Sequence, residues 1–270
     1  MNAFDLSSAA ALTLVARIAA AGVAVACLEL LVAPFELKDT ALMSWPIFQT
    51  RHRFFLLPAV DRAQAAVFAY PNVLMLLGVR FTAAATTIFA ASDSRLFAAA
   101  VAIVAATSLI LPLRTSYGLD GADQMSTTIF VALSFAAFHP TPVVHAAVLW
   151  FLTLQACVAY FTAGAAKAMG HHWRDGSGLT GIFTTDAFGN RHLGALLRRS
   201  NVTARALSWS VIALECAFPL VLVAPVPAVW MLLAAAAAFH LATALIMGLN
   251  TFVFAYFALY PAVLYCLARA

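Results

Sequence analysis

The chain has 270 residues, of which 64% are hydrophobic and only 10% are charged. Soluble domains carry about 25% charged residues, and the mean hydropathy of +0.94 lies well on the apolar side. This composition excludes a sizeable soluble domain. The net charge of +4 comes from basic residues that are dispersed along the chain, which argues against nucleic acid as a partner.

Eight apolar stretches are close to the roughly 20 residues that a helix needs to cross a bilayer. They cover 9–35, 71–91, 96–113, 123–139, 143–169, 204–224, 227–247 and 250–268. Every backbone polar group must be paired inside hydrocarbon, so the sequence predicts an all-α polytopic transmembrane bundle. We expect about eight spans in a single transmembrane domain over 1–270, with membrane lipid as its surroundings.

The segment between the first two spans is mixed in character. Trp45, Arg51, His52 and Arg53 suit the headgroup zone of a bilayer. We therefore expect an interfacial helix or loop between the first two spans.

The distribution of lysine and arginine predicts an orientation. With eight spans, ten of the fifteen basic residues fall in the loops after the first, third and fifth spans. The positive-inside rule places these loops, including the one at 170–203, in the cytoplasm. We expect an integral protein of a bacterial cytoplasmic membrane.

Lys167, one of only two lysines in the chain, lies near the end of an apolar stretch. Thr153, Tyr160 and Lys167 recur at a spacing of seven, and Gly164 follows Tyr160 by four. These positions form one stripe on a helix. Gly164 would leave room beside the lysine for a partner residue or a ligand.

Two interpretations of Lys167 follow from its chemistry. Burial disfavours the charged form of an amine, so a buried lysine can serve as a general base near neutral pH. Alternatively, the side chain snorkels to the interface from the end of its helix.

Glu215 and His240 also lie within spans, where ionisable residues are costly and usually face the bundle interior. They are candidates for holding the lysine or its ligand. His240 could equally be a hydrogen-bonded histidine of the core.

The stretch YFTAGAAKAMGHHWRDGSGL, at 160–179, combines several of these residues in a dense pattern. The pattern consists of Tyr160, Phe161, Ala163, Gly164, Lys167, Trp173, Asp175, Gly176 and Leu179. It resembles the vitamin K-dependent gamma-carboxylase-like transmembrane family, also called the HTTM domain. Weaker similarities lie at Arg17, at 121–125, and at His240, Gly248 and Phe252.

The resemblance implies a chemistry for Lys167. In the gamma-carboxylase, the aligned lysine is the base that deprotonates vitamin K hydroquinone, and oxygen then adds to the anion. A quinol-type lipid would accordingly lie beside Lys167, in a pocket shaped by Tyr160, Gly164, Trp173 and Gly176. The substrate would be a peptide or a small molecule.

Two departures from the carboxylase narrow this expectation. Ala166 stands where the carboxylase has a second lysine, and 1–270 has no counterpart of its lumenal propeptide-binding domain. We therefore do not expect carboxylation of a propeptide-tagged protein. The carboxylase site also opens to the lumen, whereas the count of basic residues places the loop after Lys167 inside.

A second function is also implied by the resemblance. Small members of the family look like the membrane maturation factor of a sporulation-delaying-protein toxin. The chain would then be a non-catalytic maturation factor or chaperone for a small secreted peptide. A small-molecule transporter is disfavoured, because the sequence has no internal repeat of the kind that many transporters show.

A metal site is a weaker hypothesis. His171, His172 and His192 are its candidate ligands. Adjacent histidines on a helix point to different faces, and we find no carboxylate at a standard metal-binding spacing. No metal is expected.

Overall fold

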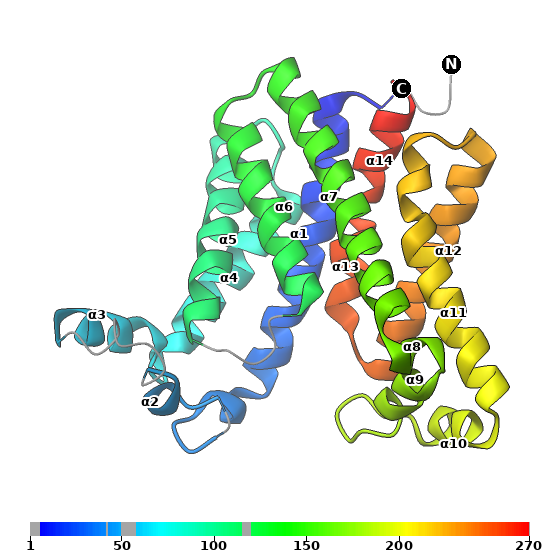
Figure 1. Cartoon of the computed structure of the whole chain (residues 1–270). Coiled ribbons are helices and arrows are strands. Elements are labelled where there is room, and N and C mark those ends of the chain that lie inside the picture. Colours follow the sequence, from blue (N-terminus) through cyan, green and yellow to red (C-terminus); the bar gives the residue numbers. More distant parts are fainter. Residues whose placement is uncertain (1–5, 42, 50–57, 115–119, 270) are drawn as a thin grey trace. The chain divides into compact units, whose positions relative to one another are not determined.

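The computed structural model describes residues 6–41, 43–49, 58–114 and 120–269. Within these ranges the chain forms helices and no strand, which confirms the predicted all-α fold (Figure 1). The helices group into two compact units, one covering Leu12–His145 and the other Ala146–Ala270 together with the N-terminal residues up to Ala11. Each unit is described by itself.

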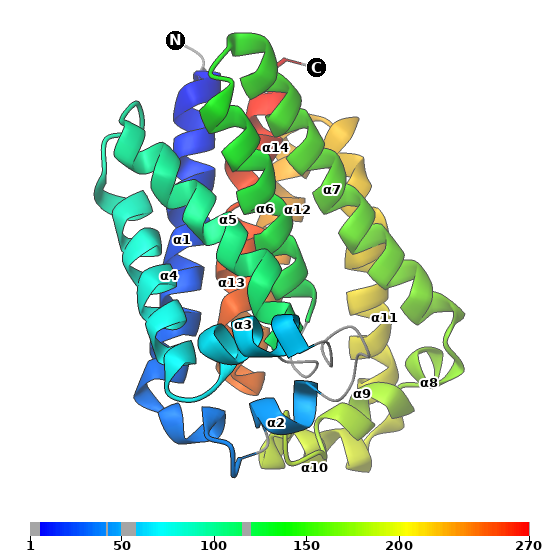
Figure 2. The same cartoon turned by 90° about the vertical axis from the view of Figure 1, so that its left-hand side faces the viewer.

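The first unit contains three long helices that run side by side, α4, α5 and α6, together with most of α1 (Figure 2). Its elements are α1 (Ser8–Val32), η1 (Pro34–Leu37), α2 (Trp45–Phe48), α3 (Pro58–Phe68), α4 (Asn72–Phe89), α5 (Arg95–Arg114) and α6 (Gly121–Phe138). Polar contacts join the long helices inside this unit. The Arg80 guanidinium on α4 donates to Thr107 Oγ1 at 3.2 Å and to Ser108 Oγ at 2.8 Å on α5.

The second unit is built on the long helices α7, α11 and α12. Its elements are α7 (Pro142–Met169), α8 (His171–Arg174), α9 (Ser177–Ile182), α10 (Arg191–Arg199), α11 (Asn201–Ala217), η4 (Phe218–Leu222), α12 (Val226–Met247), α13 (Asn250–Phe257) and α14 (Tyr260–Leu267). The short helices α8, α9 and α10 connect the end of α7 to the start of α11 (Figure 1). They pack on one another and on α11, so they close one end of this unit.

Seven helices of the described ranges are long and apolar enough to cross a membrane. They are Ser8–Val32, Asn72–Phe89, Arg95–Arg114, Pro142–Met169, Asn201–Leu222, Val226–Met247 and Asn250–Leu267. The eighth predicted span is α6, which is 18 residues long. Asp123 and Gln124 in its first turn make it more polar than the other seven.

The long helices carry large apolar side chains on their outer faces. Leu245 is 86% exposed, Phe89 is 84% exposed and Met231 is 73% exposed. Such side chains are stable in contact with lipid, whereas in water they would form an unfavourable apolar surface. The chain is therefore an integral membrane protein.

The segment between the first two spans forms the short helices η1, α2 and α3, and its depth in the bilayer stays a prediction. Trp45, predicted at the headgroup zone, is only 2% exposed and packs with Phe48 and Phe68 in a small core of the first unit. Arg51, His52 and Arg53 lie outside the described residues.

Candidate functional site

Lys167 and Glu215 form a partly buried ion pair between α7 and α11. The Lys167 ammonium donates to both carboxylate oxygens of Glu215, at 2.8 Å to Oε1 and 2.7 Å to Oε2. The Glu215 side chain is 5% exposed and the Lys167 side chain is 21% exposed. A snorkelling lysine would carry its charge into water, whereas this ammonium is bound to a carboxylate of the interior.

Gly164 explains why the two helices come close enough for this pair. A Cβ atom at Gly164 would lie 2.8 Å from the backbone nitrogen of Cys216 and 2.8 Å from Cβ of Glu215. Real Cβ atoms essentially never show such a contact, so only glycine lets α11 approach α7 here. The space beside the lysine that the sequence indicated is occupied by α11, which brings Glu215 with it.

Trp173 is a second neighbour of the lysine ammonium. The Lys167 ammonium lies 5.2 Å from the centre of the Trp173 ring, within the range of a cation–π interaction. Trp173 is half-buried and packs against the cluster of Leu179, Phe183 and Leu197. The indole therefore joins the ion pair to the small core formed by α9 and α10.

Gly176 positions the loop that carries Trp173. Its backbone has a φ of +84°, and a Cβ atom there would lie 2.6 Å from the backbone nitrogen of Arg205 on α11. Glycine is therefore required twice, for the left-handed conformation and for the close approach. Gly176 therefore affects the Lys167 site by fixing where Trp173 lies, and its own contact is with the backbone of α11.

A second buried polar pair lies on the same face of α7. Tyr160 Oη is 2.7 Å from Nε2 of His240 on α12, and the two residues are each 3% exposed. The Tyr160 ring stacks on Phe218 with centroids 3.9 Å apart, and the His240 ring stacks on Tyr256 at 4.3 Å. Aromatic rings thus fix both members of the pair.

The second nitrogen of His240 stands out within this cluster. His240 Nδ1 is buried and has no hydrogen-bond partner among the described residues. A buried polar atom without a partner costs about 1–3 kcal/mol. Such an atom is a place where a water molecule or a polar group of a ligand would be stabilising.

The two pairs are ordered along one helix. Tyr160 and Lys167 are seven residues apart on α7, which corresponds to a rise of about 10 Å. The α11 and η4 segment supplies Glu215 to Lys167 and Phe218 to Tyr160. The two segments are therefore antiparallel here. α7 therefore pairs with an acid from α11 at Lys167 and, about two helical turns away, with a histidine from α12 at Tyr160.

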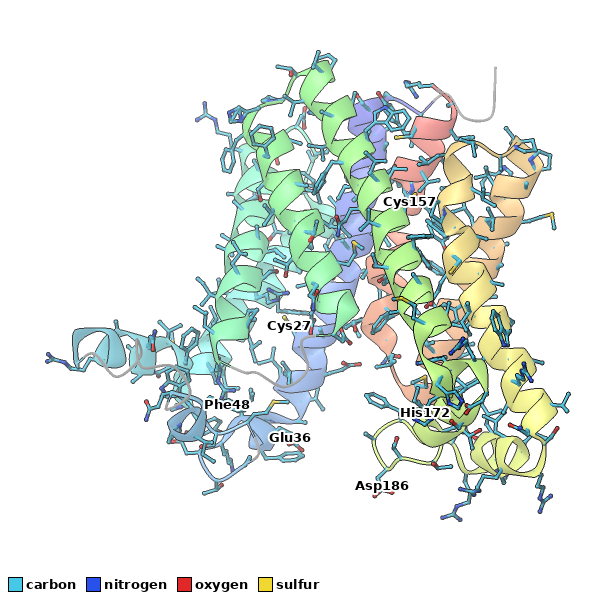
Figure 3. The ribbon with its side chains drawn as sticks, viewed as in Figure 1. Cys27, Glu36, Phe48, Cys157, His172 and Asp186 are labelled. Atoms are coloured by element: carbon cyan, nitrogen blue, oxygen red, sulfur yellow. The ribbon has the colours of Figure 1, made fainter. Side chains whose placement is uncertain are left out.

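The loop after Lys167 also holds a cluster that differs from the one expected. One ligand atom each of His171, His172 and Asp175 lies within 4.8 Å of the others, and His192 is not among them. Asp175 follows His171 by four residues, so a carboxylate at helical spacing does accompany the histidines. These side chains already have partners: His171 Nδ1 lies 3.2 Å from Asp175 Oδ2, at ion-pair distance, and His172 Nδ1 is hydrogen-bonded to Ser177 Oγ at 3.0 Å (His172 is labelled in Figure 3).

Comparisons with known proteins assign no function to this geometry. No protein-family model, curated protein or solved structure matches the chain. The likeness to the gamma-carboxylase-like family therefore depends on the sequence pattern at 160–179 and on the weaker similarities elsewhere in the chain, and the chemistry that it implies stays a prediction.

Proposed function

We propose that the chain is a membrane enzyme that uses a quinol-type lipid, with Lys167 as the base that takes the proton of a quinol hydroxyl. The observation that carries this proposal is the ion pair of Lys167 with Glu215 inside an apolar helix bundle. The lysine is the more exposed member, so a ligand would reach the amine first, with the carboxylate behind it. The orphaned Nδ1 of His240 offers a further polar contact to a ligand.

The pair supports proton transfer in two balanced steps. The Lys167 ammonium gives one proton to the Glu215 carboxylate, which makes both groups neutral. The free amine then takes the proton of the bound hydroxyl and becomes an ammonium again. Glu215 ends as the neutral acid, and the ionised hydroxyl oxygen faces the positive charge of Lys167. No net charge enters the membrane interior, where an isolated charge would be costly.

The basic residues at 170–205 support a location in a bacterial cytoplasmic membrane with this segment inside. Arg174, Arg191, Arg198, Arg199 and Arg205 all lie in or beside the helices that connect α7 to α11. The positive-inside rule favours the cytoplasm for such a segment. A quinol dissolved in the bilayer reaches the site laterally, so this orientation is compatible with the proposed chemistry.

A non-catalytic maturation factor for a secreted peptide is the second candidate. It is favoured by the same ion pair, because two hydrogen bonds from one ammonium to one carboxylate also fix α7 against α11. In that case the pair would stabilise a surface for the peptide, and no proton would move.

Oxygen uptake separates the two candidates. The purified protein in detergent is mixed with 1,4-naphthohydroquinone, and oxygen consumption is followed with an electrode. The ionised form of a quinol reduces oxygen faster than the neutral form, so a protein that ionises it accelerates uptake above the buffer rate. Glu215→Gln keeps the shape of the side chain but cannot accept the proton, and we expect it to abolish the acceleration.

The control is Glu36→Gln, which removes a carboxylate of η1 in the other unit. This variant should consume oxygen as fast as the unmodified chain. A Glu215→Gln protein that is folded and equally active would overturn the proton-transfer proposal and leave the maturation factor as the better candidate.

A further inference from the structure

A surface pocket of about 290 Å³ lies beside α10, in the segment that closes the end of the second unit. One wall is the loop from Phe183 to Gly189, and the other is a face of α10. Asp186, on this loop, is labelled at the lower end of the unit in Figure 3. The residues of this pocket are different from those of the Lys167 site.

The α10 wall is a stripe of two arginines with a glycine between them. Arg191, Gly194 and Arg198 stand at i, i+3 and i+7, so they share one face of the helix. A Cβ atom at Gly194 would lie 2.7 Å from the carbonyl oxygen of Phe183. Glycine therefore keeps the helix against the loop and leaves no side chain between the two guanidinium groups.

Both arginines are available to a ligand. In the described part of the chain, neither Arg191 nor Arg198 has a side-chain hydrogen bond or an ion pair, and Asp186 is paired with neither. The Thr184 and Thr185 hydroxyls already donate to backbone carbonyl oxygens at 2.8 Å. Two arginines and one aspartate give the pocket a net charge of +1, which a phosphodiester with its single negative charge would neutralise.

The surroundings of the pocket favour a lipid as the source of this phosphate. On the opposite side of α10, Leu197 is buried and Leu193 packs against the same core cluster, so the helix is anchored to its unit. Phe188, on the loop that forms one wall of the pocket, is 42% exposed, and Leu196, on another face of α10, is 49% exposed. Arginines beside exposed apolar groups at the end of membrane spans suit the headgroup layer.

We propose that this pocket binds the phosphodiester of an anionic membrane lipid, with Arg191 and Arg198 as its ligands. Guanidinium groups hold phosphate oxygens through paired, charge-assisted hydrogen bonds. Zwitterionic lipids carry the same phosphate with a cationic ammonium group beside it, which is trimethylated in phosphatidylcholine, so the pocket should prefer headgroups without that cation.

The test uses the full chain in detergent and a short-chain phosphatidylglycerol below its micelle concentration, with binding followed by titration calorimetry. Arg191→Gln and Arg198→Gln should each weaken binding by on the order of tenfold, because each removes a charge-assisted contact.

The matched control is Arg199→Gln, which removes the same charge from the adjacent position outside the pocket. We expect it to change the affinity by less than about twofold, because a charge that makes no contact is screened by salt. All three arginines are exposed, so the variants should fold.

Two further ligands fix the source of the phosphate. Short-chain phosphatidylcholine and inorganic phosphate should both bind at least about tenfold more weakly than phosphatidylglycerol. Equal losses in all three arginine variants would overturn the proposal, since they would indicate general attraction to a basic surface. Phosphate that competes as well as the lipid would overturn the lipid assignment in favour of a free-phosphate site. The Lys167 chemistry is unaffected by either result.

Discussion

Lys167 and Glu215 are held together by the absence of a side chain at Gly164. The glycine lies one helical turn before the lysine on α7, and α11 passes directly over it with Glu215 and Cys216. The carboxylate therefore meets the ammonium with both oxygens, at 2.8 and 2.7 Å. The backbone approach and the charge pairing depend on each other, and this dependence gives the first two predictions.

Replacement of Lys167 by arginine separates a base from a structural cation. Arginine stays charged at any accessible pH, so Lys167→Arg should keep the ion pair and the folded yield in membranes. It cannot accept a proton, and quinol-dependent oxygen uptake should fall by about 10²–10⁴-fold. Lys167→Ala should instead reduce the folded yield, because a buried Glu215 without its partner costs about 3–5 kcal/mol. Near-full activity in the arginine variant would make Lys167 a structural cation.

Gly164→Ala should push α11 away from α7. The added methyl group would meet Cys216 and Glu215 at 2.8 Å, where backbone atoms cannot easily move. We expect a loss of about 1–3 kcal/mol in the free energy of unfolding, as for other overpacked contacts. A fall in the melting temperature in detergent measures it.

The control for this variant is Gly181→Ala on α9. A Cβ atom at Gly181 would meet nothing within 4 Å. Alanine has the higher helix propensity, so this change should be neutral or slightly stabilising. Equal melting temperatures for the two variants would contradict the role assigned to Gly164.

The fold was predictable because its signals are local. A helix that crosses a membrane requires an apolar run of a fixed length, and the run at 227–247 became Val226–Met247. The shared face of Tyr160, Gly164 and Lys167 was predictable for the same reason, since it follows from the helical period alone.

The partners across the bundle were not predictable from spacing. Glu215 is 48 residues from Lys167, and His240 is 80 residues from Tyr160. Nothing in the sequence assigns one partner rather than the other to the lysine, because the assignment depends on how the helices pack. The rarity of ionisable residues in the spans was the signal that made both of them candidates.

Arg114 has buried partners that its place just after the predicted span 96–113 does not indicate. It ends α5 and is 1% exposed. Its Nε donates to the carbonyl oxygen of Phe68 at 3.0 Å, and one Nη donates to that of Leu37 at 2.9 Å. Backbone carbonyls have no sequence signature, so no pattern could have identified these partners.

Two glycines with positive φ allow the effect of backbone conformation to be separated from the effect of space. Gly176 has a φ of +84° and would place a Cβ 2.6 Å from Arg205, whereas Gly248 has a φ of +73° and would place a Cβ in open space. Gly248→Ala should cost about 1–2 kcal/mol, the cost of a left-handed alanine. Gly176→Ala should cost clearly more and should also loosen Trp173 from Lys167. Thermal unfolding and the tryptophan fluorescence of the two variants test this difference, and similar losses would contradict it.

Asp175 should keep the loop after Lys167 ordered throughout the neutral range. The Ser177 backbone N–H, and next its hydroxyl, hold the pKa of Asp175 below its ordinary value. For a carboxylate of lowered pKa, the stabilisation is complete above the ordinary pKa and is lost only as the pH falls through the lower, folded value. Hydrogen–deuterium exchange of 170–178 should therefore show the same protection from about pH 5 to about pH 8.

Two variants of Asp175 test which property of the side chain matters. Asp175→Asn keeps an oxygen that can accept the Ser177 N–H, which lies 2.8 Å from the carboxylate, so protection should largely remain. Asp175→Ala removes the acceptor and should lose the protection. Equal loss in both variants would show that the ion pair with His171 orders the loop instead.

The pair of Tyr160 and His240 should behave as one unit in a double-mutant cycle. Tyr160→Phe removes the hydroxyl that lies 2.7 Å from His240 Nε2, and the buried imidazole then has no partner for either nitrogen among the described residues. This loss should cost about 1–3 kcal/mol, because an unsatisfied buried polar group keeps its full desolvation penalty. His240→Phe removes Nε2 as a partner of the Tyr160 hydroxyl but leaves Tyr260 as its other hydrogen-bonding neighbour, so this variant should lose less stability. The double variant replaces both polar groups with rings of similar shape, and it should be less destabilised than the sum of the single variants.

Melting temperatures of the four proteins in one detergent give the coupling energy between the two side chains. Additive losses would mean that the two side chains do not depend on each other, and that the hydrogen bond contributes nothing to the stability of the bundle.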